Sequence, residues 1–360
     1  MKSLIKTLPL CIATTILVQG CAQAPIDSVA YTPPMAPALD GAYAVNEKLK
    51  QTEILAAGKV DGPEDIDVDQ YGRIYGANVD GRIVRIQKDH AGNESIKTFA
   101  ETGGRPLGIH FDAEGNLIVC DAIKGLLSIS PKGEVITLLT EVDDLPFAFT
   151  DDVDIAKDGT IYFTDASSKY GIKQYKFDLM EAKPYGRLIS YQPKTGETKV
   201  LLDNLYFANG AALSENEDFI LVVETARYRV KRYWLKGDKA GTSDIFIDNL
   251  PGFPDGISSN KKGTFWLAVP STRKADMDFL HQYPSLKNTI ARLPESMLPK
   301  PIKYGFVLGL NEQGEVIHNL QEPDGDVVHT ITSVEEKDGY IYLGSLTNDR
   351  IGRLPLSELE

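Results

Sequence analysis

One short pattern of polar and apolar positions recurs along the chain: a polar turn, an apolar strand, a polar break and a second short strand. Such runs of β-branched and aromatic residues, bounded by Gly and Asp turns, are typical of strands rather than helices. Six copies of the turn and its strand are present: DQYGRIY (69–75), DAEGNLIV (112–119), KDGTIYF (157–163), NEDFILV (216–222), KKGTFWL (261–267) and KDGYIYL (337–343). The chain is therefore predicted to be an all-β repeat protein.

The spacing of the copies indicates which repeat fold. Turn positions 72, 115, 159, 218, 263 and 339 are 43, 44, 59, 45 and 76 residues apart. The short intervals match the roughly 40–50 residues of a four-stranded propeller blade. We predict a six-bladed β-propeller over residues 49–360, closed by pairing an N-terminal strand with residues 351–354. A pair of β-sandwiches, the alternative, would not give one recurring unit.

The two long intervals locate insertions at about residues 169–185 and 271–303. The second contains MDFL (277–280) and LKNTIARL (286–293), whose apolar residues have helical spacing between prolines. Insertions in repeat proteins tend to gather on one face, which is often the binding face. We expect this helical insertion to form a cap over the channel mouth; a helix packed on the outer rim is the alternative.

The N-terminus is predicted to direct export. Lys2 and Lys6 precede an apolar run through Val18, so residues 1–20 are interpreted as a signal peptide. LVQGC (17–21) resembles the bacterial lipoprotein box, which implies a lipidated Cys21; an ordinary signal peptide is the alternative. Residues 21–48 are proline-rich and predicted to be a flexible tether. Ala22 after Cys21 implies, by resemblance to Gram-negative lipoproteins, the periplasmic side of the outer membrane.

Charge and cysteine content narrow the function. The chain has 38 Lys and Arg against 51 Asp and Glu, a net charge of −13, which argues against nucleic acid and anionic membrane surfaces as partners. Of the three cysteines, Cys11 is removed with the signal peptide and Cys21 is the predicted lipid anchor. Only Cys120 remains, so no internal disulfide is possible. Cys120 lies in an apolar run and is expected to be a buried, inert thiol.

The repeat phase also brings polar residues together. Equivalent positions of the six blades form a ring around the axis. Counting back eight positions from the turns, or nine for the turn at 218, gives Glu64, Leu107, Asp151, Asn209, Asp255 and Ile331. Three carboxylates in one ring repel unless a cation neutralises them, and Ca²⁺ prefers such oxygen ligands, whereas the lack of His and Cys disfavours Zn²⁺. We predict a calcium site at Glu64, Asp151, Asn209 and Asp255; isolated turn-capping side chains are the alternative.

Motifs around these residues carry a family resemblance. They are GPEDI (62–66), GRPLG (104–108), YFTDASSKY (162–170), NLYFANG (204–210), NLPGFPD (249–255) and DGYIYLGS (338–345). From about residue 55 to the C-terminus, the chain resembles the strictosidine synthase-like family, in particular its adipocyte plasma membrane-associated protein branch. The wider superfamily includes gluconolactonase, regucalcin and the paraoxonases. The resemblance implies a six-bladed propeller and a catalytic Ca²⁺ at the four ring positions, with a second, structural ion possible.

The chain departs from these relatives at three positions. Asp151 stands where the metal-dependent relatives usually have asparagine. Leu107 occupies the place of the paraoxonase histidine, and Thr332 that of the strictosidine synthase glutamate. The resemblance therefore argues against plant-type amine–aldehyde condensation, and it leaves any chemistry to the metal and the ring carboxylates.

The resulting hypothesis is calcium-dependent hydrolysis of a small-molecule ester or lactone by a monomer in the cell envelope. Asp255 or Asp151 would deprotonate water, and His110 and His329, near the same ends of their blades, are further candidate bases. The sequence contains no Gly-x-Ser-x-Gly, Walker A or Cys-x-x-Cys motif. It therefore gives no support for acyl-serine or nucleotide chemistry. The alternatives are a non-catalytic ligand- or partner-binding propeller with a structural metal, and a phosphotriesterase-type hydrolase.

Overall fold

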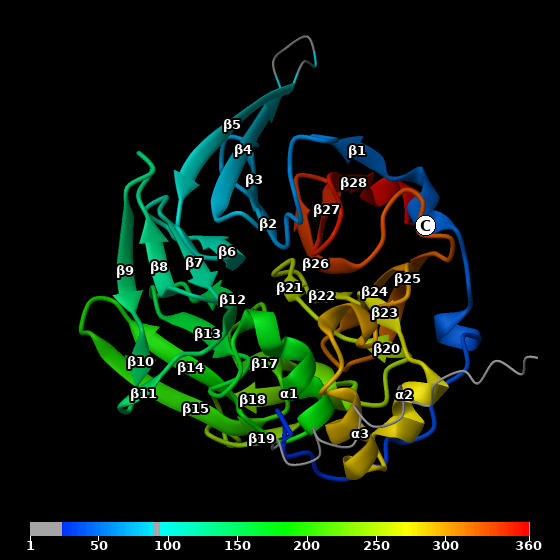
Figure 1. The fold of residues 1–360 in the computed structure, drawn as a ribbon. Helices are drawn as coiled ribbons and strands as arrows, with labels where there is room; N and C mark the ends of the chain where they lie inside the picture. Colours follow the sequence, from blue (N-terminus) through cyan, green and yellow to red (C-terminus); the bar gives the residue numbers. More distant parts are fainter. Residues whose placement is uncertain (1–23, 89–91, 93, 360) are drawn as a thin grey trace, which may run out of the picture.

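The computed structural model describes residues 24–88, 92 and 94–359, and its strands form six four-stranded antiparallel sheets around a central axis (Figure 1). This arrangement confirms the predicted six-bladed β-propeller. Cys21 and the predicted signal peptide lie outside the described residues.

Each of the first five blades is a simple antiparallel meander that begins near the axis. The first three blades consist of β2 (Ile66–Val68), β3 (Ile74–Ala77), β4 (Arg82–Lys88) and β5 (Glu94–Glu101); β6 (Pro106–Phe111), β7 (Leu117–Asp121), β8 (Gly125–Ile129) and β9 (Val135–Leu139); and β12 (Thr150–Ile155), β13 (Ile161–Asp165), β14 (Gly186–Gln192) and β15 (Glu197–Leu205). The fourth and fifth consist of β16 (Ala208–Leu213), β17 (Phe219–Glu224), β18 (Arg229–Trp234) and β19 (Ser243–Ile247); and β21 (Ile257–Ser259), β22 (Thr264–Ala268), β24 (Gly305–Asn311) and β25 (Val316–Glu322).

The sixth blade closes the ring with strands from both ends of the chain. It joins β26 (Ile331–Lys337), β27 (Tyr340–Ser345) and β28 (Ile351–Pro355) to β1 (Glu53–Leu55). Glu53 lies opposite Arg353 in this antiparallel pairing, and Leu55 lies opposite Ile351. The predicted closure by residues 351–354 is therefore confirmed, and β28 gains a partner instead of an exposed edge.

The hydrophobic core is divided into layers between neighbouring blades. Leu221 and Val223 of the fourth blade, for example, pack with Phe265 and Leu267 of the fifth. Because strand side chains alternate between two faces, every blade buries both faces against its neighbours. Cys120 is fully buried in the layer between the second and third blades, and burial raises the pKa of its thiol, as expected of an inert packing residue.

The two insertions form a cap on one face of the ring (Figure 1). The first contains α1 (Tyr175–Glu181), and the second contains α2 (Ala275–Leu280) and α3 (Pro284–Ile290). α3 contacts both other helices. Two-stranded sheets, β10 (Glu141–Val142) with β11 (Leu145–Pro146) and β20 (Gly252–Phe253) with β23 (Ser271–Thr272), complete the loops. Among the described helices, none has the length and apolar character needed to cross a membrane.

Residues 24–51 lie against the domain instead of extending from it as the tether predicted from the sequence. Ile26 is buried among cap residues. The backbone N–H of Val29 donates to the carbonyl of Glu181 at 3.0 Å, and that of Tyr31 to the carbonyl of His281 at 2.9 Å. Further along, Gln321 donates to the carbonyl of Tyr43 at 3.0 Å. We call residues 24–35 of this segment the strap. The strap ties the three cap helices together, because the hydroxyl of Ser28 also donates to Asn288 Oδ1 of α3 at 2.7 Å.

Candidate functional site

The ring residues occupy irregular points at the start of each innermost strand. The pairing register shifts within β6, β12 and β16 between residues 106 and 109, 150 and 153, and 208 and 211. Leu107, Asp151 and Asn209 lie inside these shifts. Glu64 and Asp255 hold the same place just before β2 and β21, since their N–H groups donate to Ala77 and Ala268 at 3.0 Å. β-Bulges of this kind re-aim a side chain, here toward the axis.

The sixth blade contributes Thr332 to the ring, where counting from the turn had predicted Ile331. The register of β26 shifts between Ile331 and Ser333, so the bulge places Thr332 at the ring position. Ile331 is fully buried in the hydrophobic layer beside Trp266 instead. The Thr332 hydroxyl donates to the carbonyl of Glu64 at 2.7 Å and so links the last blade to the first.

The ring forms the floor of a cavity of about 180 Å³, and the cap forms its roof. All four predicted metal ligands, Glu64, Asp151, Asn209 and Asp255, line this cavity. Its walls are mainly apolar and aromatic, and they come from both the propeller loops and the two insertions: Leu107, Phe149, Ile172, Tyr175, Leu179, Met180, Phe207, Phe253 and Met277. The insertion at 271–303 therefore covers the channel mouth rather than the outer rim.

The pKa of each floor carboxylate is raised, by burial and, for Glu64 and Asp151, by the neighbouring negative charges. Burial is the largest cause for Glu64, followed by the charges of Asp255 and Asp151. Burial, followed by the charge of Asp255, raises the pKa of Asp151 well above its usual range. Burial also raises the pKa of Asp255 to about 7, against a hydrogen bond from Asn209 that lowers it. The floor without a cation thus favours bound protons.

The donor set suits a hard cation. Glu64, Asp151, Asn209 and Asp255 present carboxylate and amide oxygens, and Asp151 Oδ2 is buried without a hydrogen-bond partner in the described chain. Asn209 Nδ2 donates to Asp255 Oδ1, so the amide oxygen is free to face a cation only after the amide turns over. Within residues 24–88, 92 and 94–359, the present side-chain positions do not bring three His, Cys, Asp or Glu residues close enough together to hold an ion. The residue types fit calcium. For all four side chains to bind the ion, the amide of Asn209 must turn over and the ring side chains must move closer together.

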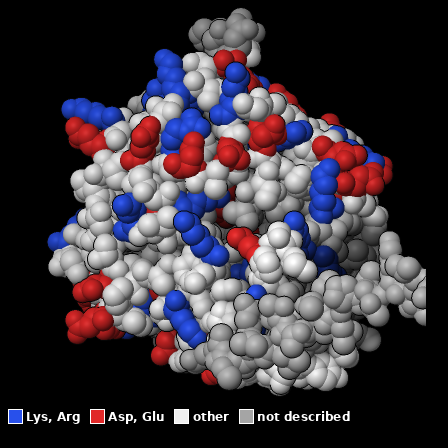
Figure 2. All heavy atoms as spheres, in the orientation of Figure 1, with Lys and Arg blue, Asp and Glu red and all other residues white. Residues whose placement is uncertain are grey.

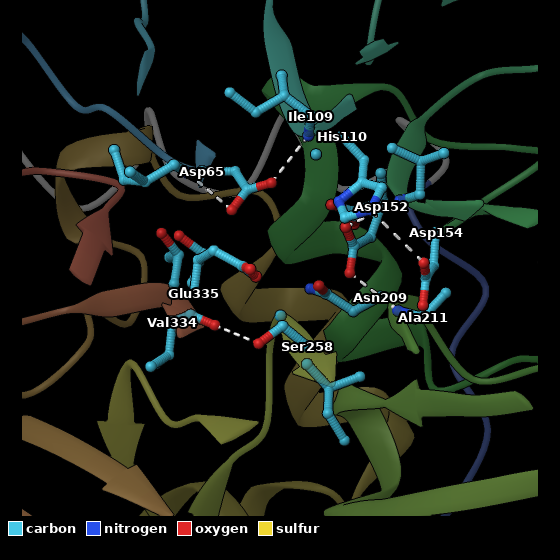
Figure 3. Close-up of a pocket in the computed structure, with 18 of the residues that line it drawn as sticks. Asp65, Ile109, His110, Asp152, Asp154, Asn209, Ala211, Ser258, Val334 and Glu335 are labelled. Carbon is cyan, nitrogen blue, oxygen red and sulfur yellow. Dashed lines mark hydrogen bonds and ion pairs between the residues drawn. The ribbon is translucent and has the colours of Figure 1, made fainter. Parts of the chain in front are cut away.

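A second, narrower space of about 40 Å³ continues down the channel beneath the ring (Figure 3). We call Asp65, Asp67, Asp152 and Asp154 the channel aspartates. Each accepts one N–H from its own strand and one from the next blade, as when Asp65 accepts from Ile109 at 2.8 Å. These residues bond neighbouring blades together.

The two candidate histidines lie away from the cavity under the cap. His110 lines the lower channel, with Nδ1 3.5 Å from Asp67 Oδ2 and Nε2 3.8 Å from Asp154 Oδ1. His329 Nδ1 is 3.0 Å from the hydroxyl of Thr330, and only Thr330 of the two lines the cavity. The structure therefore brings together Asp151 and Asp255, but neither histidine, at the floor.

The roof adds polar residues that the repeat pattern did not identify. His281, directly after α2, lines the cavity with a buried Nδ1 that lacks a partner in the described residues. Lys176, Lys274 and Lys300 also line it. All four belong to insertions, which lie outside the repeat, so counting from the blade turns could not have found them.

Two family models match the chain. One, described as strictosidine synthase, covers residues 151–238. The other, described as strictosidine synthase-like, N-terminal, covers residues 41–86. The matched regions include the ring residues Glu64, Asp151 and Asn209, so the family signal and the floor of the cavity coincide.

Solved structures share the fold. A gluconolactonase from Xanthomonas campestris has a TM-score of 0.61 at 14% identity, covering 93% of this chain and 98% of that one. Regucalcin from Agrobacterium tumefaciens, a calcium-binding protein, has a TM-score of 0.57 at 12% identity, covering 84% and 92%. At these identities the likeness shows a common six-bladed architecture.

Sequence relatives cover nearly the whole chain. Adipocyte plasma membrane-associated protein from Rattus norvegicus is 36% identical over 94% of this chain and 94% of its own length. Its Homo sapiens counterpart is 37% identical over 93% and 85%. Strictosidine synthase-like 6 from Arabidopsis thaliana is 38% identical over 92% and 86%. The chain therefore belongs to the strictosidine synthase-like family, together with the adipocyte plasma membrane-associated proteins.

Proposed function

We propose that the protein is a calcium-dependent hydrolase of small esters or lactones. The observation that carries this proposal is the buried, unpartnered carboxylate of Asp151, which faces two further carboxylates at the floor of a mainly apolar cavity. Such a floor is destabilised unless it binds protons or a cation. The fold shared with a gluconolactonase and with calcium-binding regucalcin supports the same proposal.

Each floor residue has a role in this proposal. Glu64, Asp151, Asn209 and Asp255 would hold the ion. A bound calcium would supply a Lewis acid for the substrate carbonyl. Asp255 is the floor carboxylate that we assign to take a proton from water, in addition to holding the ion. The apolar walls under the cap would exclude bulk water and bind the acyl or ring portion of the substrate.

The test is hydrolysis of a panel of aryl esters and lactones by purified protein, with calcium and with a chelator. We expect turnover only with calcium, and Glu64→Gln to lose both bound ion and activity without unfolding. Glu114→Gln, in an exposed turn of the second blade, is the matched control and should behave like the wild type. Calcium-dependent melting without turnover of any substrate would contradict the hydrolase and leave a binding propeller with a structural ion.

We further propose that the protein is a lipoprotein of the cell envelope, anchored through Cys21 on the periplasmic side of the outer membrane. The LVQGC sequence at 17–21 supports this, as does the membrane association stated in the names of its mammalian relatives. Cys21→Ser should move the protein from the membrane to the soluble fraction of a bacterial expression host. Unchanged membrane retention of this variant would contradict lipidation.

A further inference from the structure

We propose that the cavity selects small esters or lactones with an apolar body and an anionic group at the far end, which Lys176, Lys274 and Lys300 bind at the roof. This inference rests on the proposed hydrolytic function for the reacting end of the ligand. The anion-binding roof itself depends only on the cap residues.

The three roof lysines have no acidic partner among the described residues. Lys274 Nζ donates to the carbonyl of Lys300 at 2.8 Å, and Lys176 Nζ lies 5.9 Å from the ring centroid of Tyr175. Neither contact neutralises a charge. The protein carries a large excess of acid, a net charge of −13, yet these three lysines without an acidic partner line one cavity.

Neighbouring cations of the cap contrast with them. Lys169 Nζ lies 2.7 Å from Glu181 Oε1, and an Arg273 Nη2 atom lies 2.8 Å from Asp278 Oδ2. Acidic side chains are thus available within the cap, and they pair with cations that do not line the cavity. The lysines that line the cavity remain available for an anion from outside (Figure 2 shows Lys and Arg side chains around the central hollow of this face).

His281 is a second polar group of the roof that lacks a partner. Its side chain is 4% exposed, lines the cavity and has an unpartnered Nδ1. The ring packs edge-on against Tyr31 of the strap, with centroids 5.8 Å apart, which fixes its orientation. Burial, followed by the charge of Lys287, lowers the pKa of His281 to about 3, so the imidazole is neutral. A neutral, oriented ring can exchange a hydrogen bond with a ligand oxygen without adding charge.

The remaining walls limit the size of the ligand. A dry cavity of about 150 Å³ holds benzene, and this cavity of about 180 Å³ is lined mainly by apolar groups between floor and roof. It therefore suits one aromatic ring or a short acyl chain. With the ester or lactone carbonyl at the floor, the opposite end of such a ligand reaches the lysines, where a carboxylate is attracted and a neutral group is not.

Binding is tested without any reaction, by calorimetric titration of 4-phenylbutyrate and of its neutral amide. We expect the carboxylate to bind at least about tenfold tighter, equivalent to roughly 1.4 kcal/mol. The triple variant Lys176→Gln, Lys274→Gln, Lys300→Gln should remove this preference. The control triple variant at the exposed Lys132, Lys199 and Lys262 should keep it. Equal affinity for the two probes, or a preference that survives in the roof variant, would overturn the anion site.

Kinetics separate this inference from the proposed function. We expect a higher kcat/KM for 4-acetoxybenzoate, which is an anion, than for its neutral methyl ester. In the roof variant this difference should disappear, because KM for the anion rises while kcat is retained. Turnover of both esters at equal kcat/KM would overturn the inference and leave the hydrolase standing. No turnover of either, with lysine-dependent binding of 4-phenylbutyrate, would overturn the hydrolase and support the anion site.

Discussion

The central channel carries acidic residues at two levels, and the levels differ in what their carboxylates contact. Glu64 and Asp151, at the floor of the cavity, accept no hydrogen bond from a described residue that would satisfy their charge, and Asp151 Oδ2 has no partner. Asp65 and Asp152, the very next residues in sequence, each accept two backbone N–H groups at 2.8–2.9 Å. Acidic residues that are adjacent in sequence therefore differ in role: one lacks a hydrogen-bond partner at the floor, and the next bonds two blades together.

The bulged strand start explains this difference. In a strand, successive side chains point to opposite faces, and the register shift at Thr150 and Val153 turns Asp151 toward the cavity while Asp152 reaches β16 of the next blade. Figure 3 shows Asp65 of the first blade bonded to the backbone of Ile109, and Asp152 of the third blade bonded to the backbone of Ala211. Hydrogen bonding, rather than burial, thus distinguishes the acids that complete the fold from those that have no partner. Both levels contain buried members, Glu64 and Asp151 at the floor and Asp67 and Asp154 in the channel.

The largest expected effect is the loss of a channel aspartate. Asp67 accepts from Val68 at 2.6 Å and from Phe111 at 2.8 Å. Asp67→Ala leaves two buried N–H groups unpaired, at a cost of about 1–3 kcal/mol each. We expect urea unfolding to show a loss of about 2–5 kcal/mol in the free energy of unfolding. Asp238→Ala, at an exposed position, is the control. A loss below about 1 kcal/mol would contradict the bonding role of this level.

The two levels differed in how far the sequence could predict them. Blade number, closure and the four polar floor residues followed from the turns at Gly72, Gly115, Gly159 and their equivalents, because turn chemistry and alternation repeat with the blade. The prediction of Ile331 as the sixth ring residue was wrong, because a one-residue bulge in β26 shifts the count and turns Thr332 toward the axis instead. The channel aspartates were missed because a carboxylate that bonds to the neighbouring blade has no local signal. The strap had no periodicity to predict its contacts with the cap.

Calcium-free protein should lose stability as the pH rises, because of the floor. Burial raises the folded-state pKa of Asp255 to about 7. A raised carboxyl pKa stabilises the fold below the unfolded value of about 3.9, and this stability is lost as the pH rises through about 7. At about 1.4 kcal/mol per pKa unit, the loss is at most about 4 kcal/mol.

Chemical unfolding at pH 4.5 and pH 8 in chelator measures this slope. Asp255→Asn should flatten the slope, and added calcium should restore stability mainly at pH 8. Asp154 of the channel is the opposite case: burial raises its pKa, but Lys261 and His110 outweigh burial and lower the pKa overall. Its contribution is present above the unfolded pKa and lost in acid. Burial raises the pKa of the other channel aspartates, Asp65, Asp67 and Asp152, so they add to the slope of the floor. An unchanged slope in Asp255→Asn would contradict the charge imbalance at the floor.

A smaller effect, of opposite sign to that of Asp67→Ala, is expected for Asp151→Asn. This substitution removes one buried charge that Asp255 opposes and has no hydrogen bond to break. In chelator we expect the free energy of unfolding to rise by about 1 kcal/mol, the usual size of a single-substitution effect, because the repulsion by Asp255 is relieved. Because a cation loses one charged ligand, calcium affinity should fall about tenfold by titration calorimetry. Destabilisation together with unchanged calcium affinity would place Asp151 among the structural acids.

The smallest effect is expected at His110, which the sequence offered as a candidate base. Its ring nitrogens lie 3.5 Å from Asp67 and 3.8 Å from Asp154, in the lower channel and outside the cavity under the cap. His110→Asn should change kcat by less than threefold, in place of the roughly 10²–10⁴-fold loss that follows removal of a general base. His281→Asn, in the roof, should instead alter KM, because His281 lines the cavity. A loss of about 100-fold in His110→Asn would move the reaction from the floor into the channel, and the division between structural and ligand-binding acids would then fail at the level of Asp67 and Asp154.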